Sequence, residues 1–586
     1  MRSIGPRSGC TAADLCALAL FASVPLAASP WFEDQFTTMK WVALEALAVA
    51  WLLAELWRCG SHGWPAFVRE RWPAVLLLGG LVLFGSLRSG LAWALPALVE
   101  RLSFLALTMA AYWCFRRNGE RTGPIVLGAG LAAGVVLAWG LAQAFGLQPF
   151  PSLSGGDRRS ASFGNVNMTA QFLGVAVLLL LAGGDEAEGG RGGRSLRRAI
   201  VVAAFACLYF LCCRSVILAL AGGLAVLVAA RRLTAASLAR MLGVAALLVL
   251  ALLRYGPPDL PHLLRPSVLA GKAVSTEWRL SVWRSTVDLI RDHPLGVGSG
   301  DFGDAFVPYQ LGLPTIPGEA VFFRTPHNEY LRALAEEGVA FGALAGALLV
   351  SLLRRLLAIR RLAGGDSAAL ALVGAGAVFL AIEAVFQFPF GTAVGCLTAA
   401  VLLGLALAVL ERAPAAAASP RGREGRWLWR GIGTLAAAIV LVVVVRVAAS
   451  EVFFVKHPRE AAALEKACDL NPRNLPACVT AAWLRARAAD PQGARRLLHE
   501  TLQRSPYYHP AIRLLGEVAV ANGDREEGCH YLWIYDQLFR GRSALHGLVD
   551  GLCGSGRPPS LPADVTMPYY GTLPSPRAGP AGPLGS

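Results

Sequence analysis

Arginines at three places in the middle of the chain have the side-chain chemistry of a phosphate-binding site. They are Arg158 with Arg159, Arg214, and Arg279 with Arg284. A guanidinium group is always charged and binds phosphate through two parallel hydrogen bonds. Several of these groups around one pocket would suit a pyrophosphate. A single arginine at a membrane edge can also be an anchor whose charged end reaches interfacial water.

A histidine at the start of a later apolar run adds a candidate general base. Residues 325–331 read TPHNEYL, so His327 lies at the entrance of a predicted helix. The pKa of imidazole is near neutrality, and the side chain can therefore accept a proton from an attacking hydroxyl group. A lone histidine is also common in structural or solvated positions, which is the alternative.

The segment between these sites has helical spacing from Thr276 to Ile290. Arg279 and Trp283 are four residues apart and share a face, as expected of a helix that lies at the membrane interface under a lipid head group. A surface helix that only rests on the bilayer would have the same pattern. The glycine-rich run Gly296–Gly300 does not follow a buried strand, so it predicts a turn rather than a dinucleotide site.

The composition is that of a membrane protein. Of the 586 residues, 55% are hydrophobic and only 16% are charged, and the apolar residues form runs of about 20. Such runs can cross a bilayer as helices, and one soluble core could not bury them all. The net charge of +15 comes from arginine clusters between the runs. We interpret these clusters as cytoplasmic topology signals and expect no nucleic-acid binding.

The apolar runs predict an all-α fold, a polytopic bundle of about 12–13 membrane-spanning helices. The predicted spans are residues 13–30, 41–57, 73–87, 101–115, 124–146, 166–183, 199–213, 215–230, 241–254, 330–353, 367–386, 392–410 and 431–449. The first resembles a signal peptide, but we favour an uncleaved helix because more spans follow at once. With a cytoplasmic N-terminus, the segments 147–165 and 255–329 are external, so the arginines and His327 share one face.

The C-terminal residues, also predicted to be external, differ in composition from the spans. Residues 451–553 have an amphipathic helical pattern in which Pro472 and Pro506, like Asp490 and Asp524, are 34 residues apart. That period is similar to tetratricopeptide repeats, with an ordinary small helical bundle as the alternative. Residues 554–586 are rich in Pro, Gly and Ser and are predicted to be disordered. The predicted domains are thus a membrane domain at 1–450, a helical-repeat domain at 451–553 and this tail.

The cysteines form no metal-binding pattern, since none of the 12 has a partner at CxxC spacing. Cys212 and Cys213 lie at the end of an apolar run and are predicted to be packing residues. An oxidising compartment could pair some of the cysteines of the external tail. These are Cys468, Cys478, Cys529 and Cys553.

Four sequence elements occur in an order that is typical of one membrane-protein family. Residues 158–167 read RRSASFGNVN, which resembles the loop R-x-x-G-T-F-x-N-x-N, and residues 213–215, CRS, resemble the element S-R-G. Arg279 with Trp283, followed by DHPLGVG at 292–298, resembles R-x-x-x-W … D-x-P-x-G-x-G. HNEYL at 327–331 with EEG at 336–338 resembles H-N-x-Y-L … E-x-G. Together they resemble the O-antigen ligase and polymerase family over about residues 70–410.

This resemblance implies a metal-independent glycosyltransferase without a cofactor, which moves a glycan from an undecaprenyl-pyrophosphate carrier to an acceptor hydroxyl. It implies that Arg214 and Arg279 hold the pyrophosphate and that His327 orients or deprotonates the acceptor. The other residues implied in substrate binding are Arg158, Arg159, Asn165, Asn167, Trp283, Arg284, Asn328, Tyr330 and Glu336. For the two asparagines of the first loop, capping the following helix is the alternative. The expected location is a bacterial inner membrane, in contact with its lipids, with the active face and the C-terminal domain in the periplasm.

The motifs leave the acceptor open. A ligase would use a lipid A-core glycolipid, a polymerase a lipid-linked glycan, and a protein O-oligosaccharyltransferase a serine or threonine. The helical repeats are a candidate surface for a protein partner or acceptor. A transporter of lipid-linked glycans would instead need charges within its spans, for which Glu383 and Arg446 are the candidates. A structural scaffold would leave the external arginines and His327 unexplained.

Overall fold

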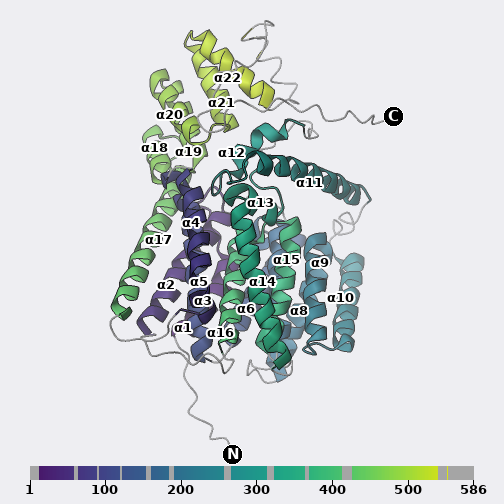
Figure 1. Ribbon diagram of the computed structural model, residues 1–586. Coiled ribbons are helices and arrows are strands. Elements are labelled where there is room, and N and C mark those ends of the chain that lie inside the picture. Colours follow the sequence, from purple (N-terminus) through teal and green to yellow (C-terminus); the bar gives the residue numbers. More distant parts are fainter. Residues whose placement is uncertain are drawn as a thin grey trace, which may run out of the picture. The chain divides into compact units, whose positions relative to one another are not determined.

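Helices make up the regular structure of the chain. The computed structural model describes residues 12–58, 64–88, 91–118, 122–153, 160–183, 191–256, 266–312, 323–362, 368–411 and 425–538, together with 549, 551 and 553. Within these ranges there is no strand, and the predicted all-α class is confirmed. The α-helices, most of them labelled in Figure 1, are α1 (Ala12–Ser23), α2 (Thr37–Arg58), α3 (Ala66–Glu70), α4 (Trp72–Arg88), α5 (Leu91–Asn118), α6 (Gly123–Ala144), α7 (Val166–Ala182), α8 (Arg191–Leu211), α9 (Arg214–Ala229), α10 (Ala235–Tyr255), α11 (Pro266–Asp292), α12 (Phe302–Phe306), α13 (Glu329–Glu337), α14 (Val339–Leu362), α15 (Ala368–Phe386), α16 (Ala393–Leu410), α17 (Gly425–Lys456), α18 (Ala461–Leu470), α19 (Leu475–Arg487), α20 (Pro491–Arg504), α21 (His509–Ala521) and α22 (Arg525–Leu538).

Seven of the helices in the described ranges are long and apolar enough to cross a membrane, which makes the chain a multi-pass membrane protein. They lie in α5, α6, α10, α14, α15, α16 and α17, and α1, α4, α7 and α9 are shorter apolar helices. The two other predicted spans coincide with α2 and α8. Every predicted span therefore falls on a helix, while the number of about thirteen crossings stays a prediction.

One predicted span begins later than expected because a glycine interrupts the helix. The sequence pattern continues through residues 330–353, whereas α13 ends at Glu337 and α14 begins at Val339. Gly338 has φ +90°, a conformation that residues with a Cβ rarely adopt. A Cβ here would also lie 2.6 Å from the carbonyl carbon of Leu295. α13 is thus a short helix of its own before the apolar α14.

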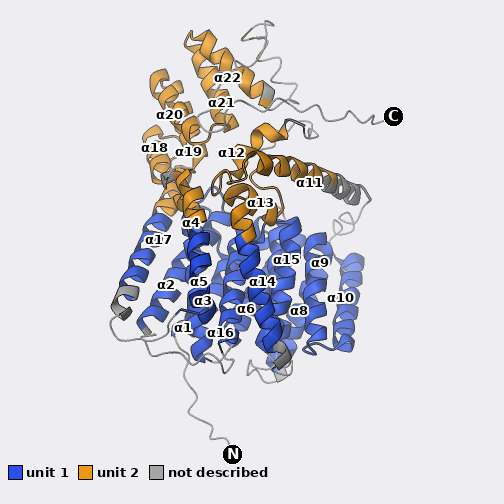
Figure 2. Ribbon diagram, viewed as in Figure 1, with its two compact units in different colours: residues 1–79, 98–269, 344–445 blue, residues 80–97, 270–343, 446–586 orange. Residues whose placement is uncertain are grey.

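The first of two compact units contains most of the apolar helices. Unit 1 comprises residues 1–79, 98–269 and 344–445, blue in Figure 2. Within it, α7 contacts α6, α8, α9, α15 and α16, and most of α7 is buried. Glycines allow these helices to approach closely, since a Cβ on Gly174 would lie 2.7 Å from Phe379 and a Cβ on Gly223 would lie 2.8 Å from Leu178. Small residues at such contacts are typical of helix packing in membranes.

Unit 2 comprises residues 80–97, 270–343 and 446–586, orange in Figure 2. It therefore combines most of the long predicted external segment with the C-terminal helices, and the helix predicted at 276–290 is confirmed as part of α11. Val282 and Leu289 are seven residues apart on α11 and belong to a small buried core. The core also includes Val297, Phe302, Ala305, Phe306, Phe323 and Ala335. The predicted functional domain boundaries at 450 and 553 stay predictions.

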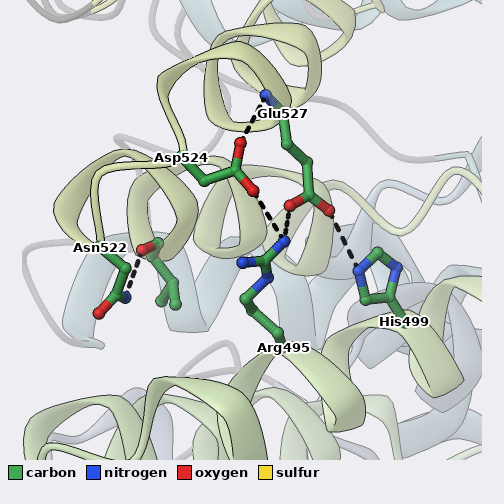
Figure 3. Close-up of polar contacts among 6 residues, drawn as sticks. Arg495, His499, Asn522, Asp524 and Glu527 are labelled. Atoms are coloured by element: carbon green, nitrogen blue, oxygen red, sulfur yellow. Dashed lines mark hydrogen bonds and ion pairs between the residues drawn. The ribbon is translucent and has the colours of Figure 1, made fainter.

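The C-terminal helices recur with the predicted period. α19 and α21 begin 34 residues apart, as do α20 and α22. Asp490 and Asp524 have equivalent roles, because each accepts a hydrogen bond from a backbone amide in the first turn that follows, at Gly493 (2.9 Å) and Glu527 (3.3 Å). Figure 3 shows Arg495 of α20 bonded to both Asp524 and Glu527. The helices thus stack in sequence from α18 to α22, while their assignment as tetratricopeptide repeats stays a prediction.

Two disulfides join the cysteines that the sequence suggested for pairing. Cys468–Cys478 connects α18 to α19, and Cys529–Cys553 connects α22 to a residue beyond it. The tail at 554–586, predicted to be disordered, lies outside the described residues.

Candidate active site

Two of the sequence motifs meet in unit 1, at the N-terminal ends of α7 and α9. The chain turns sharply between α8 and α9, where Cys212 has φ +52°, and Arg214 is the first residue of α9. The Cys213 thiol donates a hydrogen bond to the side-chain oxygen of Asn167, with a sulfur-to-oxygen distance of 3.3 Å. The loop that ends at residue 167 and the CRS element are therefore neighbours in space, and Cys213 does more than pack.

Asn165 caps α7, which confirms the alternative interpretation of this residue. Its side-chain oxygen accepts a hydrogen bond from the amide of Asn167 at 2.8 Å. Asn165 and Arg214 are both exposed. Because the first amides of a helix carry partial positive charge, an exposed guanidinium at such an end favours an anionic ligand. Arg158 and Arg159, predicted to assist, lie outside the described residues.

In unit 2, Trp283 holds the peptide that precedes His327. The indole Nε1 of Trp283 donates a hydrogen bond to the carbonyl oxygen of Pro326 at 2.9 Å. Arg279, one turn earlier on α11, is partly exposed, and Arg284 is exposed. His327 has φ +51°, which for a residue with a Cβ costs about 1–3 kcal/mol and persists only where the surroundings enforce it. The hydrogen bond from Trp283 is one such constraint.

α13 begins two residues after His327 and is fixed at its first turn. The buried Asn328 is its N-cap, and its side-chain oxygen accepts a hydrogen bond from the amide of Leu331 at 3.0 Å. Glu329 and Arg332 form an ion pair at 2.9 Å. Tyr330 is 47% exposed, whereas Glu336 is buried. Of the predicted substrate-binding residues on this helix, only Tyr330 is thus open to solvent, and Asn328 has a structural contact.

The glycine-rich segment packs its backbone against the end of α13. The amides of Val297 and Gly298 donate hydrogen bonds to the carbonyl oxygens of Ala335 (2.8 Å) and Glu336 (3.0 Å). Gly296 has φ +82°, and a Cβ there would lie 2.3 Å from the Glu336 carbonyl oxygen. The predicted turn is confirmed, and its glycines serve a backbone-to-backbone contact between two of the sequence motifs.

Residues 80–97 contact the glycine-rich segment and the residue that follows it, which the sequence did not predict. The Arg88 guanidinium donates a hydrogen bond to the carbonyl of Gly296 at 2.7 Å. The Trp93 indole donates one to the Asp301 carboxylate, also at 2.7 Å. In each case 208 residues separate the partners, so no local pattern could have predicted the contact.

A buried lysine was also missed in unit 1. Lys40, in the first turn of α2, is 4% exposed, and its ammonium group donates hydrogen bonds to the carbonyl oxygens of Ala27 (2.7 Å) and Ser162. It also lies 4.7 Å from the centre of the Phe163 ring. Lys40 therefore holds the loop that leads to Asn165. No local sequence pattern could have indicated this contact, because Lys40 and Ser162 are 122 residues apart.

Burial changes the electrostatics of the polar groups around the glycine-rich segment. It raises the pKa of Asp304 to about 7, against the smaller opposing effect of the hydrogen bond that Ser505 donates. The Tyr309 hydroxyl donates a hydrogen bond to Asp292 at 2.9 Å, and burial followed by this bond raises the pKa of Tyr309. Within the described residues, no three His, Cys, Asp or Glu side chains are grouped as metal ligands.

The predicted site residues therefore fall into two groups. Asn165, Asn167 and Arg214 lie together in unit 1, and residues of α11 and the His327–Glu337 segment lie together in unit 2. That both groups serve one pocket stays a prediction.

Part of the chain is similar in sequence to a known protein family. No curated protein matches the chain in sequence. Residues 199–345 match the sequence model of the O-antigen ligase family. The match is narrower than the predicted resemblance, but it includes Arg214, Arg279 and His327. Over this region, which runs from α8 to the first turns of α14, the chain is similar to O-antigen ligases.

Proposed function

We propose that this protein is an inner-membrane glycosyltransferase of the O-antigen ligase type. It transfers a glycan from an undecaprenyl-pyrophosphate carrier to an acceptor hydroxyl on the periplasmic face. The observation that carries the proposal is the match of residues 199–345 to the O-antigen ligase family, within which Trp283 fixes the strained His327 segment. A histidine that is held in this way is typical of a site whose geometry matters for function.

The reaction needs a base for the acceptor and positive charge for the leaving group. The acceptor oxygen bonds to the anomeric carbon of the glycan while the bond from that carbon to the pyrophosphate oxygen breaks. The hydroxyl proton passes to the imidazole of His327, and undecaprenyl pyrophosphate leaves. Arg214 and Arg279 stabilise the charge that develops on the pyrophosphate. No metal ion is needed in this scheme, because the two guanidinium groups supply the positive charge.

The exposure of side chains on α11 and α13 supports roles for these helices in contacting lipid and substrate. Leu280 is 45% exposed and Arg284 is exposed on α11, which suits a helix at the interface that contacts lipid tails and head groups. The exposure of Tyr330 on α13 supports a role for it in contacting the acceptor or the glycan. The two disulfides of the C-terminal helices support an oxidising compartment such as the periplasm.

Transport is less well supported than transfer. Of the two charges that the sequence offered for a path through the membrane, Arg446 donates hydrogen bonds to the carbonyl oxygens of Asp469 (2.8 Å) and Leu470 (3.1 Å) at the end of α18. Its charge therefore caps a helix. Glu383, buried in α15, is the other candidate.

The test is glycan transfer by the purified full-length protein from an undecaprenyl-pyrophosphate-linked donor, with EDTA present. Acceptors are supplied separately as lipid A-core, lipid-linked glycan and a serine-containing protein, which distinguishes ligase, polymerase and protein transferase. We expect His327→Ala and Arg279→Ala to lower kcat by about 100-fold or more, the usual scale for a lost general base or charge-stabilising donor.

Matched variants come from the same unit. Arg291→Ala removes a 70% exposed arginine from α11, and His457→Ala removes an exposed histidine. Both should transfer at the wild-type rate. A wild type that transfers to none of the three acceptors, or a fully active His327→Ala, contradicts the proposal and makes donor transport the next assay.

A further inference from the structure

The turn between α18 and α19 reaches the glycine-rich segment through one arginine. Arg473 donates hydrogen bonds from Nε to the carbonyl of Trp93 (2.7 Å) and from a terminal nitrogen to the carbonyl of Ser299 (3.1 Å). Its guanidinium also lies 5.2 Å from the centre of the Trp93 ring. A Cβ on Gly300 would lie 2.7 Å from the guanidinium nitrogens, so the bare backbone at this position makes room for Arg473.

The segment that Arg473 contacts is the one that supports α13. Ser299, whose carbonyl accepts from Arg473, donates from its hydroxyl to the Glu337 carboxylate at 2.7 Å. Its neighbours Val297 and Gly298 bond to the backbone of α13, as described above. Residues 297–300 therefore contact both Arg473 and α13. His327 lies two residues before α13, so the chain of contacts leads from the C-terminal helices to the segment of the candidate base.

The turn that presents Arg473 has a disulfide and hydrogen bonds of its own. The Cys468–Cys478 disulfide closes it, and the side-chain oxygen of Asn471 accepts the Arg473 amide at 3.2 Å. Asn474 caps α19, because its side-chain oxygen accepts a hydrogen bond from the amide of Ala477 at 3.2 Å. Its side-chain amide donates a hydrogen bond to the hydroxyl of Ser450 at 3.1 Å. These constraints on the backbone reduce the entropy that the turn can lose when the guanidinium binds.

A second hydrogen bond connects the C-terminal helices to α12, which follows the glycine-rich segment. The buried Ser505, between α20 and α21, donates a hydrogen bond to Asp304 of α12. Asp304 lies four residues after Gly300. The C-terminal helices therefore contact both the glycine-rich segment and α12, which follows it.

We propose that Arg473 is a positioning residue for the transfer reaction, through which the C-terminal helices hold the His327 segment in its active geometry. This inference rests on the proposed function. Among the described residues, the Arg473 guanidinium contacts the backbone carbonyls of Trp93 and Ser299 and the Trp93 ring, and no predicted substrate-binding side chain is among these contacts. Its loss should therefore lower kcat and leave KM for the donor almost unchanged. The Cys468–Cys478 disulfide has the same role indirectly, because it closes the turn that carries Arg473.

The experiment compares variants of the full-length protein in two measurements. The first is kcat and KM for transfer from the undecaprenyl-pyrophosphate donor, and the second is hydrogen exchange in peptides that cover residues 295–300 and 329–338. Arg473→Ala should lower kcat at least about tenfold, with donor KM within about twofold and faster exchange in both peptides. Arg473→Lys keeps the charge and one donor group, and it should recover kcat to within about threefold of wild type.

Two matched controls come from the same helices. Arg487→Ala removes an arginine that lies 4.8 Å from the ring of Trp483 in α19, and it should leave both measurements unchanged. Replacing Cys468 and Cys478 by serine should lower kcat, whereas the same change at Cys529 and Cys553 should not.

Three results would overturn the inference. They are a wild-type kcat in Arg473→Ala, a loss of kcat no larger than in Arg487→Ala, and a loss carried entirely by donor KM. If the wild type itself transfers nothing, the proposed function fails, but the positioning role of Arg473 can still be tested by hydrogen exchange. Unchanged exchange at residues 329–338 in Arg473→Ala would contradict the positioning role.

Discussion

The contact between Gly296 and the end of α13 permits a quantitative test of how the His327 segment is held. Alanine at this position would have φ +82° and a Cβ 2.3 Å from the Glu336 carbonyl oxygen and 2.7 Å from the Gly338 nitrogen. Both atoms belong to the backbone, so no side-chain rotation can relieve the overlap. The glycine-rich segment and α13 must separate.

The expected cost has two parts. A residue with a Cβ loses about 1–2 kcal/mol in the left-handed conformation relative to glycine. The separation also weakens the hydrogen bonds from Val297 and Gly298 to α13, each of which contributes about 0.5–1.5 kcal/mol. We therefore expect Gly296→Ala to weaken the contact by about 3 kcal/mol, or roughly 100-fold in its opening equilibrium.

Hydrogen exchange followed by mass spectrometry measures that equilibrium directly. In Gly296→Ala, amides 297–298 and 332–339 should exchange about 100 times faster than in wild type, and transfer should fall. The control is Gly346→Ala in α14, where a Cβ meets nothing within 4 Å. That change should be neutral or stabilise the helix by about 0.5–1 kcal/mol. Wild-type exchange in Gly296→Ala would refute the idea that this contact holds α13.

Three further predictions follow from single groups. Trp283→Phe keeps an aromatic ring but removes the donor to Pro326, and it should lower kcat/KM for transfer about fivefold, which corresponds to about 1 kcal/mol. Lys40→Met leaves the buried carbonyl of Ser162, at a cost of about 1–3 kcal/mol, and the partly buried carbonyl of Ala27 without this donor, and should lower the Tm measured in detergent by several degrees. Burial raises the pKa of Asp304 from 3.8 to about 7, so the folded state binds this proton more tightly than the unfolded state does. The stability of the wild type should therefore fall as the pH rises from about 4 to 7, and Asp304→Asn should remove that part of the pH dependence of the denaturation midpoint.

Each of these three predictions has a control, which is the same substitution at an exposed residue of the same type. Trp483→Phe removes a partly exposed indole, and Lys466→Met and Asp469→Asn change exposed charges. Trp483→Phe should leave kcat/KM unchanged, Lys466→Met should leave the Tm unchanged, and Asp469→Asn should leave the pH dependence of the denaturation midpoint unchanged. A Lys40→Met protein as stable as wild type, or a denaturation midpoint with the same pH dependence in Asp304→Asn, would contradict the corresponding argument.

The sequence predicted the helices well because their cause is local. Apolar runs such as 166–183 and 392–410 coincide with α7 and α16 to within a residue or two, and Pro, Gly and polar residues mark their ends. The break at Gly338 was missed, since helical periodicity continues across it and only the backbone contact with Leu295 requires the positive φ. The 34-residue period was likewise visible, because the same capping aspartates recur at 490 and 524.

The candidate site was predicted in part. Motifs identified Arg214, Arg279, Trp283 and His327, since the residue types themselves indicate chemistry. The groups that position them were missed. Arg473 and Trp93 are 380 residues apart in the chain, and neither belongs to a local pattern. Asn328 was assigned to substrate by its motif, which stays a prediction, and the motif gave no sign that this side chain is also the N-cap of α13.

The short helix after His327 has a further consequence for how this segment can change. α13 has nine residues, and both of its ends are tied, by the Asn328 cap at one end and by Gly338 against residues 294–295 at the other. Each added residue turns a helix by about 100° and lengthens it by about 1.5 Å. A single insertion or deletion would therefore rotate the candidate base relative to the glycine-rich segment. The helix acts as a spacer of fixed length and phase, so its residue count should tolerate less change than the identity of its exposed side chains.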